Sequence, residues 1–134
     1  MPTCRTARGA SGAAVVDIVL VMVVLVPVVL GILQLALVLM VRNTLASAAS
    51  EGARYAATLD HEPADGVVRT REQIDQAIAG RYARDVSVQR VVLDGAPAVQ
   101  VTVRAVVPAL GLGGPGVELE VTGHAVEEEA VVGP

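Results

Sequence analysis

The chain contains one long uninterrupted apolar segment near its N-terminus. Residues 18–41 are 24 consecutive positions without a charge, dominated by Val and Leu, with Gln34 as their one clearly polar member. As an α-helix this segment is about 36 Å long, enough to span a hydrocarbon core of about 30 Å with some tilt. A chain of 134 residues has too little other material to cover such a helix on all sides. The pattern therefore predicts a single transmembrane helix.

A helical pattern continues beyond the apolar segment. Residues 43–59 are rich in alanine and lack proline. Within them, a stripe of mostly small residues recurs at intervals of three and four positions, namely Leu45, Ala48, Gly52, Tyr55 and Leu59. Small side chains let a neighbouring backbone approach closely. The stripe predicts a face that packs against either another helix or the protein's own sheet, and both alternatives remain open.

The helical pattern is followed by a predicted loop and a predicted short helix. Residues 60–66 contain His61, Pro63 and Gly66 among acids, and we expect them to form a loop that ends the long helix. Apolar residues then recur at helical spacing over residues 71–83, which predicts a second helix.

Three stretches of alternating residues predict three strands, at 86–93, 98–107 and 117–125. The middle one has apolar residues at every second position, namely Val99, Val101, Val103, Ala105 and Val107. Asp94 and Gly95 form a turn signal before it, and a glycine-rich loop follows it. The predicted fold class is α+β, with a long N-terminal transmembrane helix that continues into a small domain of one short helix and about three antiparallel strands.

Charge gives the expected orientation. Arg5 and Arg8 precede the apolar segment, whereas residues 43–134 contain 13 acids and 7 arginines. The positive-inside rule therefore predicts a cytoplasmic N-terminus and an extracytoplasmic C-terminal domain. The net charge of -4 and the lack of a basic cluster beyond the leader argue against nucleic-acid binding.

The expected organisation is a basic leader at 1–12, a transmembrane helix at 13–41, an extramembrane helical continuation at 42–59 and a small α+β domain at 60–134.

An acid stands at the start of the apolar segment. Asp17 follows a run of small residues that includes Gly12 and Ala13. An ionised carboxylate costs about 2.5–3.5 kcal/mol near the centre of a membrane helix and less toward an end, so such residues usually have a partner or a role. Alternatively, Asp17 reaches the headgroup region and interacts with the positive end of the helix dipole.

Two motifs resemble those of the TadE-like proteins, minor pilins or pseudopilins of the tight-adherence (Flp) pilus apparatus. The first is the run of small residues from Gly12 to the acid Asp17. The second follows the apolar segment and consists of Glu51, Gly52, Ala53, Arg54 and Tyr55. The resemblance covers residues 8–58 and implies a pilin-like fold, a place in the cytoplasmic membrane, no enzymatic activity and no cofactor. The chain departs from the family in having Asp17 where Glu is usual.

The resemblance also implies processing. A prepilin peptidase would cleave after Gly12, which leaves Ala13 as the first residue and Asp17 as the fifth; Gly9 is the other candidate, but its fifth following residue is Ala14. After cleavage, the acid would lie near the free amine of a neighbouring subunit. The implied partners are cytoplasmic-membrane lipids, the peptidase, and other pilin or TadE- and TadF-like subunits of a type IVb (Tad) pilus or a related secretion system.

Two other functions remain as alternatives. An uncleaved chain would be a single-pass scaffold of a secretion complex that uses the stripe of small residues. Cleavage by a signal peptidase near Ala48 would instead release a secreted binding domain. The apolar segment is longer than the usual signal core of about 7–15 residues, and Arg42 intervenes before the cleavage position.

The sequence predicts no metal-binding, catalytic or phosphate-binding site. His61, Glu62 and Asp65 are candidate metal ligands, but the second histidine, His124, is far away in the sequence, and the segment fits a solvated loop better. No nucleophile is accompanied by a candidate base, and the glycines of 111–116 lack the Lys-Ser or Lys-Thr of a phosphate-binding loop.

Overall fold

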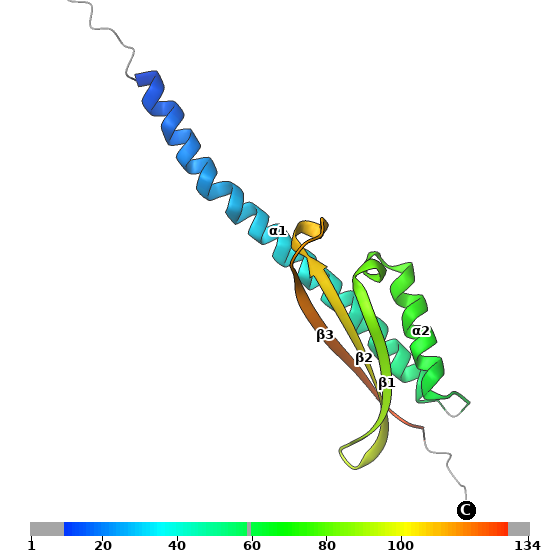
Figure 1. Ribbon diagram of the computed structural model, residues 1–134. Helices are drawn as coiled ribbons and strands as arrows, with labels where there is room; N and C mark the ends of the chain where they lie inside the picture. The colour runs from blue at the N-terminus through cyan, green and yellow to red at the C-terminus, as the bar shows by residue number, and fades with distance from the viewer. Residues whose placement is uncertain (1–9, 59, 129–134) are drawn as a thin grey trace, which may run out of the picture. The chain divides into compact units, whose positions relative to one another are not determined.

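The computed structural model describes residues 10–58 and 60–128 and has an α+β fold, as the sequence predicted (Figure 1). The elements are α1 (Ala10–Ala56), α2 (Pro63–Gln76), the 3₁₀-helix η1 (Ile78–Tyr82), β1 (Ala83–Leu93), β2 (Ala96–Pro108), the 3₁₀ turn η2 (Ala109–Gly111) and β3 (Gly116–Val126). Residues 1–9 of the basic leader, with Arg5, Arg8 and Gly9, lie outside the described residues, as does the last stripe residue, Leu59. The last three leader residues, 10–12, belong to α1.

Helix α1 contributes to two compact units, one that ends at Leu35 and one that begins at Ala36. In the first unit, residues 12–33 are all exposed, and the helix is long and apolar enough to cross a membrane. Exposure of this surface to water is unfavourable, because removing apolar surface from water stabilises a protein by about 25 cal/mol per Å². Pro27 lies inside the helix, where it removes one backbone N–H donor, a defect that membrane helices tolerate.

Helix α2 begins earlier than expected, at Pro63, so the predicted loop over residues 60–66 is wrong from that residue onward. Proline suits the first turn of a helix because its missing N–H has no helical partner there. The preceding Glu62 caps the helix, and its backbone N–H donates to the Asp65 carboxylate at 2.8 Å. Proline therefore starts this helix and does not mark a loop.

The same helix ends at Gln76 and not at residue 83, because Ala77 has an extended backbone conformation. The chain then turns tightly under the end of α2. A Cβ atom on Gly80 would lie 2.9 Å from the carbonyl oxygen of Ile74, so glycine permits this close turn. The 3₁₀-helix η1 follows and carries Tyr82 into the core.

The three strands form an antiparallel sheet in the order β1-β2-β3. Asp94 and Gly95 connect the first two strands, and both have positive φ angles of 51° and 86°, as the predicted two-residue hairpin turn requires. The alternation predicted for the central strand is confirmed, since its five apolar positions are buried, namely Val99, Val101, Val103, Ala105 and Val107.

The C-terminal part of α1 forms the core together with the sheet and α2. Its buried side chains in the main cluster are Val41, Leu45, Ala48, Ala49 and Ala53. Three members of the predicted stripe, Leu45, Ala48 and Gly52, are therefore buried within the chain's own domain. Tyr55, by contrast, remains 39% exposed. For the three buried positions, the structure selects the protein's own sheet and second helix as the partner.

Truncation of the central strand tests this core. Val101 is fully buried, so Val101→Ala should lower the free energy of unfolding by about 2 kcal/mol. The matched control is Val92→Ala at a side chain that is 75% exposed, where the change should stay within about 0.5 kcal/mol. Urea unfolding of the full chain in detergent, followed by circular dichroism, measures both. Equal losses in the two variants would contradict the assigned core.

Candidate functional site

The first group of candidate residues lies at the start of α1. Gly12, Ala13 and Asp17 are all helical and exposed. Asp17 is four positions after Ala13, so the two lie on the same helix face, one turn apart. A chain that began at Ala13 would therefore carry its amine and its first carboxylate on one side of the helix.

The charge of Asp17 lacks a basic neighbour along the chain. Between Arg8 and Arg42 the sequence contains no Arg, Lys or His. Side chains interact along a helix only over three or four residues, so no basic residue is within reach on this one. A carboxylate at this position is stabilised by headgroups and water, by the chain's own N-terminus, or by a positive group on another molecule.

The second group of candidate residues lies where α1 crosses α2. A Cβ atom on Gly52 would overlap Oγ1 of Thr70 and lie 2.7 Å from the carbonyl oxygen of Gly66. A Cβ atom on Gly66 would in turn lie 2.7 Å from the Cβ of Ala56. The buried Thr70 hydroxyl donates to the Gly66 carbonyl at 2.7 Å and lies 3.5 Å from the Ala48 carbonyl oxygen. The backbones of the two helices are thus in direct contact.

The sheet approaches the same part of α1 equally closely. A Cβ atom on Gly123 of β3 would overlap the backbone of Ala49 and Ser50. Ala53 is fully buried. Gly52 of the second motif therefore leaves room for Thr70 and the backbone of α2, and Gly123 lets the sheet approach α1 just before that motif. The sequence analysis did not predict the role of Gly123. The one sequence signal for it is a glycine within a strand, which often marks the close approach of another backbone.

The other residues of the second motif are at least partly accessible. Glu51 is half-buried and Arg54 is exposed. The Tyr55 ring packs on the His61 ring with their centroids 4.0 Å apart and a tilt of 54°. Nδ1 of His61 is also hydrogen-bonded to the Thr58 hydroxyl at 2.8 Å. The motif is thus divided between small residues inside the domain and larger residues that face outward.

The residues considered as metal ligands take part in local structure. His61 packs on Tyr55, and Asp65 accepts the hydrogen bond from the backbone of Glu62. Among residues 10–58 and 60–128, no three His, Cys, Asp or Glu side chains are grouped so that they could hold a metal ion.

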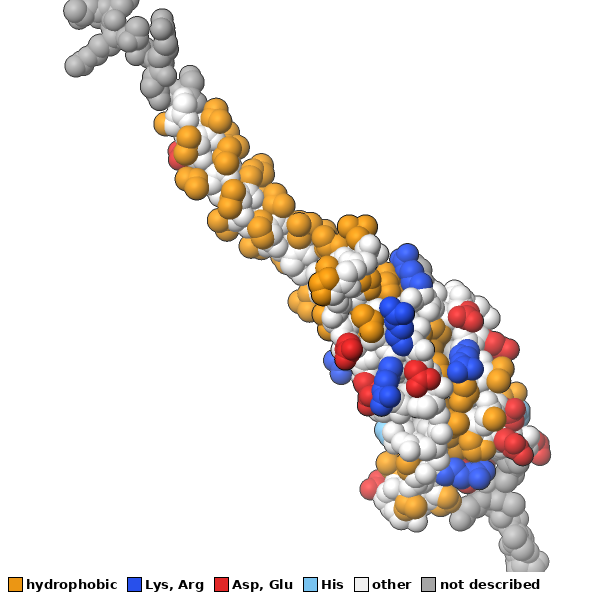
Figure 2. All heavy atoms as spheres, in the orientation of Figure 1, with side chains coloured by type: hydrophobic (Ala, Val, Ile, Leu, Met, Phe, Trp, Pro, Cys, Tyr) orange, Lys and Arg blue, Asp and Glu red, His pale blue; other side chains and the backbone are white. Residues whose placement is uncertain are grey.

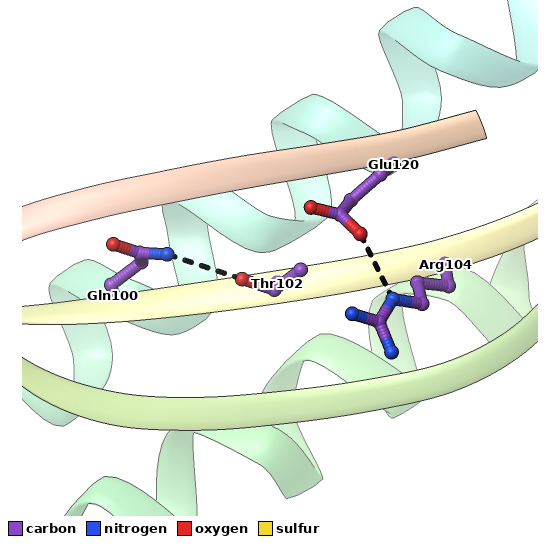
Figure 3. Close-up of polar contacts among 4 residues, drawn as sticks. All are labelled: Gln100, Thr102, Arg104 and Glu120. Atoms are coloured by element: carbon purple, nitrogen blue, oxygen red, sulfur yellow. Dashed lines mark hydrogen bonds and ion pairs between the residues drawn. The ribbon is translucent and has the colours of Figure 1, made fainter.

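The outward face of the sheet carries polar side chains that the sequence analysis did not single out. Figure 3 shows Arg104, which donates through Nε to the Glu120 carboxylate at 2.9 Å, and Gln100, which donates to the Thr102 hydroxyl at 3.3 Å. The hydrogen bond from Arg104 to Glu120 and the negative charge of Glu120 raise the pKa of the Arg104 guanidinium. Both partners are well exposed, so the ion pair adds little stability. This face is a solvated surface.

Comparison with known proteins identifies one family. Residues 12–54 match the family model described as TadE-like protein, which confirms the resemblance inferred from the sequence. The match runs from Gly12 through the apolar segment to Arg54, and it does not extend to α2 or the sheet. No curated protein and no solved structure matches the chain.

The contact between the two helices can be tested at Gly52. Gly52→Ala should lower the free energy of unfolding by about 1–3 kcal/mol, because the added methyl group meets Thr70 and the Gly66 backbone. Gly31→Ala is the control in the same helix, since no atom lies within 4 Å of the added methyl group. It should be neutral or slightly stabilising. Thermal unfolding in detergent distinguishes them, and similar midpoints would argue against the close crossing.

Proposed function

We propose that this protein is a minor pilin or pilus-assembly subunit of a Tad (Flp) pilus or a related secretion system. The observation that carries the proposal is the match to the TadE-like family over residues 12–54, which includes the first motif and most of the second. The protein does no chemistry itself. It acts by presenting a membrane-spanning helix and a small folded domain to other subunits.

The apolar part of α1 anchors the chain in the cytoplasmic membrane. Residues 12–33 expose apolar side chains around the whole helix, as a lipid-facing or bundle-forming helix does. Arg5 and Arg8 keep the N-terminus on the cytoplasmic side, so the domain is extracytoplasmic.

A prepilin peptidase processes the chain after Gly12. The spacing from Gly12 to Asp17 supports this site, because cleavage leaves the acid at the fifth position of the mature chain. The new amine of Ala13 on one subunit then approaches the carboxylate of Asp17 on its neighbour. Opposite charges stabilise each other in a lipid-like environment where either alone is costly.

Sister subunits meet on two parts of α1. One is the exposed apolar surface of residues 12–33, and the other is the outward side of the second motif at Arg54 and Tyr55. The small residues between them are buried by the chain's own α2 and sheet. Assembly therefore uses the larger residues of the motif, while the small ones hold the domain together.

Release of a secreted domain near Ala48 is less well supported. Ala48 is buried in the middle of a core helix, and its carbonyl oxygen lies 3.5 Å from the Thr70 hydroxyl. Cleavage there would remove Val41 and Leu45 from the main core cluster. An uncleaved scaffold retains the whole core and is the second candidate, distinguished by its intact leader.

Mass spectrometry of the mature N-terminus, in cells with and without their prepilin peptidase, tests the processing. We expect a chain that begins at Ala13 only when the peptidase is present. An intact leader in both strains would contradict processing and favour the uncleaved scaffold. A peptidase-independent N-terminus near Glu51 would instead indicate a secreted domain.

The role of the acid is tested by Asp17→Ala. This variant should insert in the membrane normally but give at least tenfold fewer assembled pili, since a lost charge pairing of about 1.4 kcal/mol is a factor of ten at each contact. Asp17→Glu, which restores the residue usual in the family, is the control and should assemble normally. Counting pili by electron microscopy, with membrane fractionation for insertion, gives both readouts. Normal numbers of pili in the Asp17→Ala variant would contradict the role of this acid in assembly.

A further inference from the structure

The connection between β2 and β3 is uncharged and exposes large apolar side chains. Residues 105–117 contain no charged residue. Within this stretch Leu112 is 87% exposed, Val117 46% and Leu110 38%. Leucines this accessible at the tip of a loop are unfavourable in water, and such patches mark contact with a protein or a membrane.

The backbone of this loop is held in a conformation that most residues avoid. Leu110 has a φ angle of 51°, and the glycines at 111, 113 and 114 have φ angles of 72°, 104° and 93°. This conformation is strained for Leu110, because it is one that glycine adopts easily and leucine rarely does. Gly111 and Gly113 flank Leu112 and let the chain turn on either side of it.

The loop lies beside the end of the membrane-spanning segment. A Cβ atom on Gly111 would lie 3.3 Å from the Tyr82 hydroxyl and 3.9 Å from Cδ2 of Leu37. Leu37 belongs to α1 and to the uncharged run of residues 18–41. That run is about 36 Å long and the hydrocarbon core about 30 Å, so the excess is about four residues. Leu37 is five residues before Arg42 and therefore lies close to the hydrocarbon boundary.

The arginines near the loop agree with a position at the membrane surface. Arg42 is the first charge after the uncharged run. The guanidinium of Arg81 lies 4.9 Å from the ring centroid of Tyr82, the residue whose hydroxyl faces Gly111. Arginine side chains at this level suit lipid phosphates, because the aliphatic stem lies along apolar surface while the head stays in the headgroup region. Figure 2 shows hydrophobic side chains around the β2–β3 loop and charged side chains farther along the sheet.

We propose that the loop of residues 109–115 contacts the bilayer that α1 spans, with Leu110 and Leu112 in its interfacial region. We choose lipid as the partner because the loop lies beside Leu37, near the end of the membrane-spanning run. A stable protein interface needs about 800 Å² from each partner, far more than the tip of this loop offers. The inference rests on the membrane anchor of the proposed function and not on its role in a pilus.

Single-cysteine labelling of the full chain in lipid vesicles tests the contact. Cys4 is the sequence's one cysteine, so Cys4→Ser gives the background. Three variants carry an environment-sensitive fluorophore: Leu112→Cys at the loop, Val92→Cys at the opposite end of the β1–β2 hairpin, and Val24→Cys within the apolar segment. Val92 is the matched control because it is also apolar and highly exposed, at 75% against 87% for Leu112. Quenching by aqueous iodide and by lipid-borne nitroxide is measured for each label.

We expect the label at residue 112 to show blue-shifted emission, strong nitroxide quenching and little iodide quenching, while the label at 92 shows the reverse. If residue 112 is as accessible to iodide as residue 92 while residue 24 reports lipid, the anchor is retained and the loop contact is overturned. Protection of residue 112 from both quenchers indicates burial against protein and overturns the lipid contact as well. Iodide quenching at residue 24 would show that the anchor itself fails.

Discussion

The contact of α1 with both α2 and the sheet, made through backbone atoms, is the constraint on which the folded domain depends. Gly52 meets the Gly66 carbonyl and Thr70 on one side, and Gly123 meets the backbone of α1 on another. The chain has two tyrosines and no Phe or Trp, so few aromatic side chains are available to fill gaps between layers. Close approach of the backbones replaces them, since packing at short distance recovers the dispersion contacts that a void would lose.

One consequence is that α1 has two surfaces with different requirements. Residues 12–33 are exposed all round the helix, whereas Leu45, Ala49 and Ala53 are fully buried by the domain. Because both surfaces belong to one continuous helix, no loop separates the apolar segment from the core.

Another consequence concerns the outer surface. The small residues of the second motif serve the fold, which leaves Arg54 and Tyr55 as the members available for contacts with other molecules. The partly exposed Tyr55 ring packs on the ring of His61.

Local patterns were sufficient for much of the structure. The alternation from Val99 to Val107 identified the central strand because side chains of a strand alternate between faces. Asp94 and Gly95 identified the hairpin turn because few residues adopt positive φ. The loop predicted around Pro63 is wrong, because a proline can either end a helix or begin one, and here it follows the capping residue Glu62.

The sequence by itself determined the long apolar helix, the three strands and a helix face of small residues, since each depends on a pattern of neighbouring residues along the chain. What covers that face was decided only by the tertiary structure. Spacing places Ala48 and Gly52 on one side of a helix, yet it contains no information about which distant residues reach them. Thr70, Gly66 and Gly123 come from two later elements, and only the folding of α2 and β3 onto α1 brings them there.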